Sequence, residues 1–189
     1  MVLDLGTGDG RAVVARARAE PASFVLGIDA DARSMAEASH RAARRIERGG
    51  LPNALFLAEA AERLPGPLAE TVSLVTVTFP WGSLLAGVLG REPAVTAGIA
   101  GLVRPGGRIE VLVSVEPGDG IDGLARLTAH DEAWLAGAWI PHGLRLSCHR
   151  PATTDEVLAS GSTWGRRLLG GGRGPMTSRR MVWRLGLER

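Results

Sequence analysis

The chain has 189 residues and a mass of 19.8 kDa, the size of one domain that can bury its own core, which argues against a tandem array or a disulfide-stapled miniprotein. It contains no Lys, so all 22 basic side chains are Arg, and they face 20 Asp and Glu for a net charge of +2. Residues 1–139 carry 13 Arg and 17 acidic groups, whereas residues 140–189 carry 9 Arg and 3 acidic groups. This basic C-terminal part indicates contact with an anion such as nucleic acid.

Cysteine content and hydropathy indicate where the protein works. Cys148 is the only cysteine, so the chain cannot form an internal disulfide and is compatible with a reducing compartment. The sequence has neither a signal peptide nor an apolar run of about 18 residues. We therefore expect a cytoplasmic protein that does not enter a membrane.

The first part of the chain alternates apolar segments with segments of helix-forming composition. In chain order these predict strand 2–5, helix 11–19, strand 24–28, helix 32–48, strand 54–57, strand 72–78, helix 83–103 with a break near 90–93, and strand 109–115. Strands that alternate with helices imply a parallel sheet with helices on both faces.

The last third is less regular. It predicts helix 124–139, strand 144–149, helix 154–159, a loop over 160–175 that is rich in Gly and Arg, and strand 181–187. The last two strands are expected to pair antiparallel at one edge of the sheet. The fold class is thus α/β, with a doubly wound, mostly parallel seven-stranded sheet in a single domain over residues 1–189.

A glycine-rich turn follows the first predicted strand. Residues 4–10 read Asp-Leu-Gly-Thr-Gly-Asp-Gly, and such a turn brings a ligand close to the backbone and to helix N-terminal amides. The dinucleotide fingerprint would require a Gly where Arg11 stands. The spacing, with Asp4 ahead of it, resembles motif I of class I S-adenosylmethionine (SAM) methyltransferases. Asp29, at the end of the second strand, would accept the ribose hydroxyls; the alternative is a turn that is merely tightly packed.

The aromatic residues are unusual, with five Trp, three Phe and no Tyr. Trp134, Trp139 and Trp183 lie in apolar segments and are expected in the core. Trp81 follows Pro80 after the fourth strand, and Trp164 lies in the predicted 160–175 loop. Beside a cofactor site these two indoles could sandwich a flat base, although either one could instead anchor its loop on the core.

Two groups of arginines stand out. Arg41, Arg44, Arg45 and Arg48 have helical spacing, so the predicted helix 32–48 would carry them on one stripe that faces water or an anion. Further arginines form a second basic region beside Trp164: Arg166, Arg167, Arg173, Arg179 and Arg180. The planar guanidinium group suits bidentate contact with phosphate.

Four segments carry a more specific resemblance. They are residues 49–53 (GGLPN), 59–65 (EAAERLP), 79–85 (FPWGSLL) and 162–168 (STWGRRL). Together they resemble the aminoglycoside-resistance 16S rRNA (adenine-1408 N1)-methyltransferases of the Kam/Npm type. The resemblance spans most of residues 2–168, and it implies that an N-terminal extension of the family is missing.

The resemblance implies a role for each matching position. The cofactor would be held by Asp4, Gly6, Thr7, Gly8, Gly10, Asp29, Ala30, Ala61, Glu62, Thr78, Ser83 and Ser162. Trp81 and Trp164 would act as the catalytic pair by stacking on the target adenine. Arg41, Arg44, Arg45, Arg48, Arg166, Arg167 and Arg173 would contact RNA.

The expected activity is transfer of a methyl group from SAM to N1 of A1408 in the decoding site of 16S rRNA, on the assembled 30S subunit, which confers aminoglycoside resistance. Adenine N1 has a free lone pair, so the reaction needs no general base, and no metal is expected. We expect a monomer. Two alternatives stay open: a class I methyltransferase of a small molecule, and a SAM-binding, ribosome-associated protein with little activity.

Overall fold

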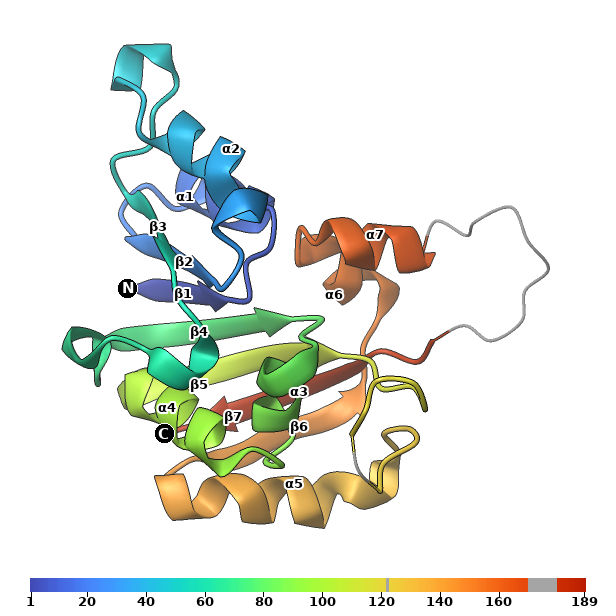
Figure 1. Ribbon diagram of the computed structural model, residues 1–189. Helices are drawn as coiled ribbons and strands as arrows, with labels where there is room; N and C mark the ends of the chain where they lie inside the picture. The colour runs from blue at the N-terminus through green and yellow to red at the C-terminus, as the bar shows by residue number, and fades with distance from the viewer. Residues whose placement is uncertain (122, 170–179) are drawn as a thin grey trace.

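The computed structural model describes residues 1–121, 123–169 and 180–189. A seven-stranded sheet with the order β3-β2-β1-β4-β5-β7-β6 runs through the molecule (Figure 1). Its strands are β1 (Val2–Leu5), β2 (Val25–Asp29), β3 (Ala54–Ala58), β4 (Val72–Thr78), β5 (Val103–Val113), β6 (Arg145–Pro151) and β7 (Trp183–Glu188). The first five pair in parallel, and β7 is antiparallel to both β5 and β6. The predicted α/β fold with an antiparallel edge is confirmed.

Helices cover both faces of the sheet. They are α1 (Arg11–Ala19), α2 (Ala32–Ala42), α3 (Gly82–Val88), α4 (Pro93–Leu102), α5 (Glu132–Trp139), α6 (Thr154–Ala159) and α7 (Thr163–Leu169). Figure 1 shows α1, α2, α6 and α7 toward the top of the view, whereas α3 and α4 lie in front of the lower strands and α5 lies beneath them. Five short 3₁₀ turns also lie in the described part of the chain: Ile46–Arg48, Ala61–Arg63, Gly66–Leu68, Ala129–Asp131 and Ile140–His142.

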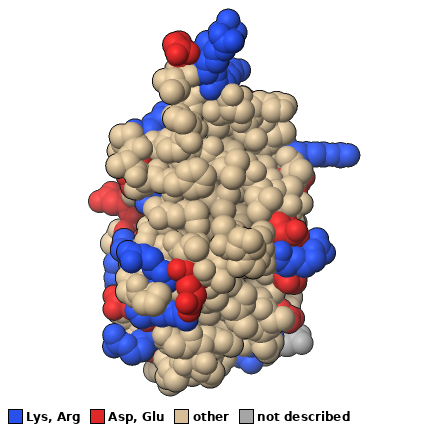
Figure 2. Space-filling model, turned by 90° about the vertical axis from the view of Figure 1, so that its left-hand side faces the viewer, with Lys and Arg blue, Asp and Glu red and all other residues tan. Residues whose placement is uncertain are grey.

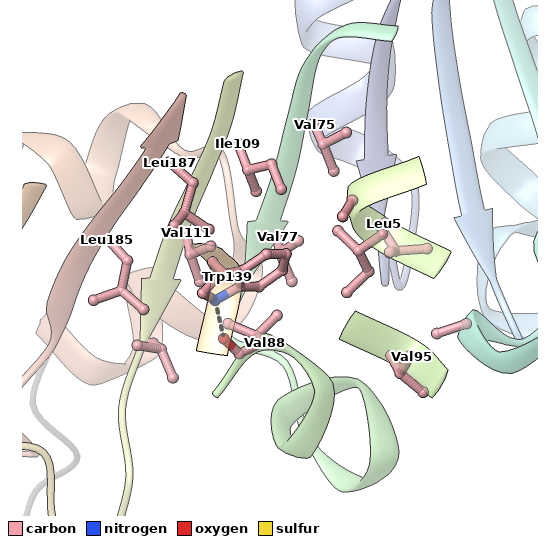
Figure 3. Packing of buried hydrophobic residues seen from close by; sticks show 14 of the residues in the cluster. Leu5, Val75, Val77, Val88, Val95, Ile109, Val111, Trp139, Leu185 and Leu187 are labelled. Atoms are coloured by element: carbon pink, nitrogen blue, oxygen red, sulfur yellow. Dashed lines mark hydrogen bonds between the residues drawn. The ribbon is translucent and has the colours of Figure 1, made fainter. Parts of the chain in front are cut away.

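The main core lies between the sheet and the helices α3, α4 and α5. Alternate side chains of β4 and β5, such as Val77 and Val111, meet Val88 of α3 and the fully buried Trp139 of α5 (Figure 3). The indole nitrogen of Trp139 donates to the Val88 carbonyl at 3.2 Å. A buried indole therefore keeps its one donor paired while it joins two helices to the sheet.

The predicted helix 32–48 is wrong in its second half. α2 ends at Ala42. The Ala42 carbonyl accepts a hydrogen bond from Leu51 N at 2.9 Å, and not from the amide four residues later as it would in a continuing α-helix. Gly50 makes this return possible, since a Cβ there would lie 1.7 Å from the Arg44 carbonyl oxygen. Arg44 and Arg45 therefore lie in a turn, and the expected single helical stripe with Arg41 and Arg48 does not form.

Several other boundaries shift by one or two residues, and three differ by more. Residues 163–169 of the expected loop form α7, β5 begins at Val103 rather than at residue 109, and α5 begins only at Glu132 rather than at residue 124. The break that was expected near 90–93 is present between α3 and α4. Among the described residues no helix is both long and apolar enough to cross a bilayer.

Candidate active site

A large cavity opens at the edge of the sheet where β1, β2 and β4 end. Leu5, Asp29 and Thr78, the last residues of these strands, all line it, as does the turn after β1. Its volume is about 1130 Å³. This is above the roughly 300–1,000 Å³ that is usual for one small ligand. Crevices at this edge are where doubly wound sheets bind ligands.

The glycine-rich turn forms one wall and is held from two sides. Asp29 accepts a hydrogen bond from Gly8 N at 2.7 Å, and the Ser34 hydroxyl donates to the Gly8 carbonyl at 2.8 Å. Gly10 has φ +69°, and a Cβ there would lie 2.6 Å from the Phe56 ring, so only glycine fits. The turn thus exposes backbone at the cavity, with the Asp29 carboxylate beside it.

Asp4 lies at the floor of the cavity, where it is 8% exposed. Burial raises the pKa of its carboxyl above the usual 3.8, and the hydrogen bond from the Thr76 hydroxyl opposes this rise only in part. The Thr76 hydroxyl lies 2.8 Å from Asp4 Oδ1. A buried carboxyl of this kind is costly for folding and typical of a functional site.

The opposite rim is built from the turn 61–63 and the start of α3. Ala61 is buried and offers an apolar surface, while Glu62 and Ser83 are exposed. The Ser83 hydroxyl lowers the pKa of Glu62, so this carboxyl is ionised at neutral pH. This rim therefore combines an apolar patch with an anion.

Two indoles also line the cavity. Trp81, just before α3, is 86% exposed. Trp164, in the first turn of α7, is 39% exposed, packs against Phe79 with ring centroids 4.8 Å apart, and has the Arg180 guanidinium 5.5 Å from its ring. Phe79 adopts φ +52°, a conformation that is uncommon for a non-glycine residue. The structure thus brings Trp81 and Trp164 to one cavity.

Most of the residues that the sequence predicted for the cofactor lie around this cavity. Those that line it are Asp4, Gly6, Thr7, Gly8, Asp29, Ala30, Ala61, Glu62, Thr78, Ser83 and Ser162. Gly10 does not line it and instead precedes the first residue of α1. These residues fit SAM, because they offer a carboxylate for the ribose, an apolar patch for the adenine and exposed backbone amides.

Several cavity residues were missed by sequence reasoning. Ser114, at the end of β5, is 6% exposed, and its hydroxyl has no hydrogen-bond partner among the described residues. Asp119 forms an ion pair with Arg180 at 3.6 Å, in a stretch to which the sequence analysis assigned no contact. Asp9 and Thr163 also line the cavity. Asp9 and Thr163 lie in segments that the sequence singled out, but their pairing, like that of Asp119 with Arg180, depends on a partner far away in the chain.

The predicted RNA-contacting arginines occupy two places. Arg44, Arg45 and Arg48 are exposed on and beside the turn that follows α2, and Figure 2 shows basic groups gathered at this tip of the molecule. Arg41, also exposed, is paired with Glu37 at 3.7 Å. Arg166 and Arg167 are exposed on α7, and Arg167 lines the cavity. Arg173 lies outside the described residues, as does Arg179.

The strand order and the cavity define a class I methyltransferase, with a motif I turn at the end of β1. The model of a family described as NpmA, 16S rRNA (adenine(1408)-N(1))-methyltransferase, matches residues 1–180. The chain therefore belongs to this family, which confirms the resemblance that the motifs carried.

Individual relatives agree with this assignment. The 16S rRNA (adenine(1408)-N(1))-methyltransferase of Streptoalloteichus tenebrarius is 39% identical over 89% of this chain and 80% of its own length. The crystal structure of the 16S rRNA methyltransferase KamB has a TM-score of 0.86 at 34% identity, with 99% of this chain and 86% of that chain covered.

A further structure bears on the cofactor. A W203A mutant of the 16S rRNA (adenine(1408)-N(1))-methyltransferase from Catenulisporales acidiphilia, solved with cosubstrate SAM, has a TM-score of 0.83 at 28% identity, with 99% of this chain and 84% of that chain covered. Together with the family assignment, it confirms SAM as the predicted cofactor.

Proposed function

We propose that this protein transfers a methyl group from SAM to N1 of A1408 in 16S rRNA, and that it acts on the assembled 30S subunit and confers aminoglycoside resistance. One observation carries the proposal: a single cavity joins a motif I turn to two indoles, Trp81 and Trp164, and is larger than one small ligand requires. Relatives named for this same reaction support the choice of substrate.

The residues of the first half of the sheet bind the cofactor. Asp29 would accept the ribose hydroxyls with the lone pairs that Gly8 and Asp31 leave free, and Ala61 and Glu62 would lie near the adenine. Ser83 and Ser162 would contact the methionine end. When bound, SAM supplies a methyl group on a sulfonium centre, a carbon that is open to attack by a lone pair.

The other wall receives the target base. Adenine N1 is unprotonated at neutral pH, so the protein must extrude, align and shield the base rather than remove a proton. Stacking on an aromatic side chain contributes about 1–3 kcal/mol per base, so Trp81 and Trp164 can offset the few kcal/mol that extrusion costs. The described residues near the indoles form no triad of nucleophile and base, which agrees with this chemistry.

The arginines supply the contact with rRNA. Arg44, Arg45 and Arg48 form one exposed basic tip. Arg166 and Arg167 form a second exposed basic group on α7, beside Trp164. Neither Arg44 nor Arg45 has an acidic partner within ion-pair distance among the described residues, so both are available to phosphate oxygens. Two separated contacts fix the orientation of the enzyme on a folded RNA surface, which favours the assembled subunit over free RNA.

We further infer that one domain over residues 1–189 acts as a monomer in the cytoplasm and needs no metal. The ribosomal substrate supports the location. Light scattering of the purified protein tests the oligomeric state. EDTA treatment of the purified enzyme, with the chelator removed before 30S subunits are added, tests the metal, since methyl transfer should be unchanged.

The decisive experiment is primer extension on 16S rRNA from cells that express this chain. A stop at A1408, absent from cells that carry the empty vector, reports N1 methylation directly, and the same cells should grow in the presence of an aminoglycoside. Purified 30S subunits should also accept labelled methyl from SAM more readily than free 16S rRNA does. Loss of the stop, with labelled methyl found only on small molecules, would contradict the proposal.

A further inference from the structure

One hydrogen bond joins the cofactor turn to the helix that carries Trp164. The hydroxyl of Thr163, the first residue of α7, donates to Asp9 Oδ2 at 2.9 Å, although the two residues are 154 positions apart. Asp9 Oδ1 accepts from Arg11 N at 3.1 Å, which fixes the direction of the carboxylate. The acceptor of this bond, the Asp9 carboxylate, is therefore held in place by the glycine turn.

The backbone around this bond also brings the two segments together. Gly161, just before α7, faces α1, and a Cβ added there would lie 3.5 Å from Ala12 Cα. The Ser162 hydroxyl accepts from Gly165 N at 3.2 Å and so closes the first turn of α7. Asp9, Ala12, Ser162 and Thr163 all line the active-site cavity. The start of α7 is thus seated directly on the cofactor turn.

The first turn of α7 also contacts Phe79, in the segment that follows β4 and leads to Trp81. Trp164 packs on Phe79, and a Cβ on Gly165 would lie 2.7 Å from the Phe79 ring, so α7 and the segment after β4 are in close contact. Thr163 immediately precedes Trp164. A shift of Thr163 away from Asp9 therefore moves or tilts the indole relative to the cavity.

We propose that Asp9 and Thr163 are positioning residues that couple the cofactor turn to α7, so that a filled cofactor site holds Trp164 in place for the target base. The inference rests on the proposed function for its meaning, and it gives a role to two residues that lie in the quoted motifs but are not in the predicted cofactor set. Gly8 connects the cofactor site to Asp9. Its amide donates to Asp29, the residue proposed to hold the ribose, and Gly8 immediately precedes Asp9 in the chain.

Coupling of this kind is reciprocal in binding. If the cofactor favours the α7 position that receives the base, then 30S subunits must tighten cofactor binding by the same factor by which the cofactor tightens 30S binding. An exposed hydrogen bond is worth a modest factor, so we expect roughly 3- to 10-fold in each direction.

The test compares three substitutions at the first residue of a helix. Thr163→Val removes the donor and keeps the shape, and Thr163→Ser keeps the donor and should rescue. Thr154→Val is the matched control, because Thr154 is the exposed first residue of α6 and donates no hydrogen bond to the described residues. Thermal unfolding of each variant confirms that it is folded.

The first readout needs no activity. Hydrogen exchange of the 163–169 backbone is measured by mass spectrometry with and without S-adenosylhomocysteine as the probe. The wild type and Thr154→Val should gain protection in α7 when the probe binds, whereas Thr163→Val should bind the probe within about 3-fold of wild type and gain less protection. Equal protection in Thr163→Val and wild type would overturn the inference.

The second readout separates this inference from the proposed function. In methyl transfer to 30S subunits, Thr163→Val should lower kcat roughly 3- to 10-fold and raise the KM for SAM by up to the same factor, because 30S subunits no longer tighten cofactor binding, and Thr163→Ser should restore both. If wild type fails to methylate 30S subunits but keeps the coupled protection, the proposed function falls and the coupling stands. If wild type methylates and Thr163→Val has the same kcat and the same protection, the coupling falls alone.

Discussion

Trp81 and Trp164 line one cavity but differ in how firmly the structure holds them. Trp164 belongs to α7, packs on Phe79 and lies beneath the Arg180 guanidinium. Trp81 lies in an extended backbone conformation ahead of α3, with most of its indole in solvent. One wall of the base site is therefore ordered before any RNA arrives, and the other carries an indole with few contacts.

This difference has an energetic consequence. Fixing a free side chain on binding costs about 0.5–1.5 kcal/mol, so stacking on Trp81 returns less net free energy than stacking on Trp164. The ordered indole acts as a platform for the extruded base, and the free indole closes over it. Variants that act on one wall and spare the other can test this division.

The largest effect is expected when either indole is removed. Trp164→Ala and Trp81→Ala should each lower the initial rate of methyl transfer to 30S subunits by about 10- to 100-fold, since each removes about 1–3 kcal/mol of stacking. Trp164→Ala should be the more severe, because it also strips a contact from Phe79 and Arg180. SAM affinity, measured by calorimetry, should hardly change. Robust transfer by both variants would remove the stacking mechanism.

A somewhat smaller effect should come from the basic tip, which touches neither wall. Reversing Arg44 and Arg45 to Glu should weaken 30S binding by about 10-fold or more and flatten its salt dependence, because phosphate contacts are lost. The control reverses Arg104 and Arg145, two exposed arginines near the starts of β5 and β6, at the sheet edge opposite the cavity. Equal affinity in the two double variants, measured by filter binding, would assign the tip to ordinary surface and favour a small-molecule substrate.

A several-fold fall in kcat is expected for Gly165→Ala, a substitution that acts on Trp164 and not on Trp81. Gly165→Ala places a Cβ 2.7 Å from the Phe79 ring and 3.1 Å from Val157, so α7 must shift and carry Trp164 with it, while Trp81 is untouched. We expect kcat to fall about 5-fold with a destabilisation of about 1–3 kcal/mol. Gly137→Ala in α5, where a Cβ meets nothing within 4 Å, should instead stabilise by about 0.5–1 kcal/mol at full activity. A neutral Gly165→Ala would show that the Trp164 wall tolerates displacement.

Sequence patterns predicted the framework because its signals are local. Strands β1 and β4 and helix α6 have the predicted boundaries, since each apolar or capped segment ends at its own turn residues. The motif I turn and Asp29 were also readable, as they lie at fixed offsets from strand ends. Roles for individual site residues stay predictions until the variants above are measured.

The errors share a cause, which is that contacts outside the regular helical repeat overrode the local pattern. α2 ends early because Leu51 and Gly50 fold back on its last turn. Residues 163–169 read as a loop because of their Gly and Arg content, yet they form α7 where Gly165 fits against Phe79 and Thr163 bonds to Asp9. No pattern within a short window could have predicted partners that lie 86 and 154 positions away.

The smallest expected effect concerns Asp4, on the floor beneath both walls. Because burial raises the pKa of its carboxyl above 3.8, the native state holds the Asp4 proton at pH values where the unfolded chain has lost it. The Asp4 contribution to the free energy of unfolding is therefore intact below pH 3.8 and falls as the pH rises through the native pKa. Asp4→Asn removes this loss, so its Tm relative to wild type should rise by a few degrees at pH 7 and by less at pH 4. Scanning calorimetry at the two pH values checks the sign. A variant that is less stable than wild type at pH 7 would show that the hydrogen bonds of the Asp4 carboxylate outweigh the cost of burying it.

Asp4 lines the part of the cavity that is proposed to bind the cofactor. Asp4→Asn should therefore weaken SAM binding, whereas 30S affinity should stay at the wild-type value because Trp81 and Trp164 are unchanged.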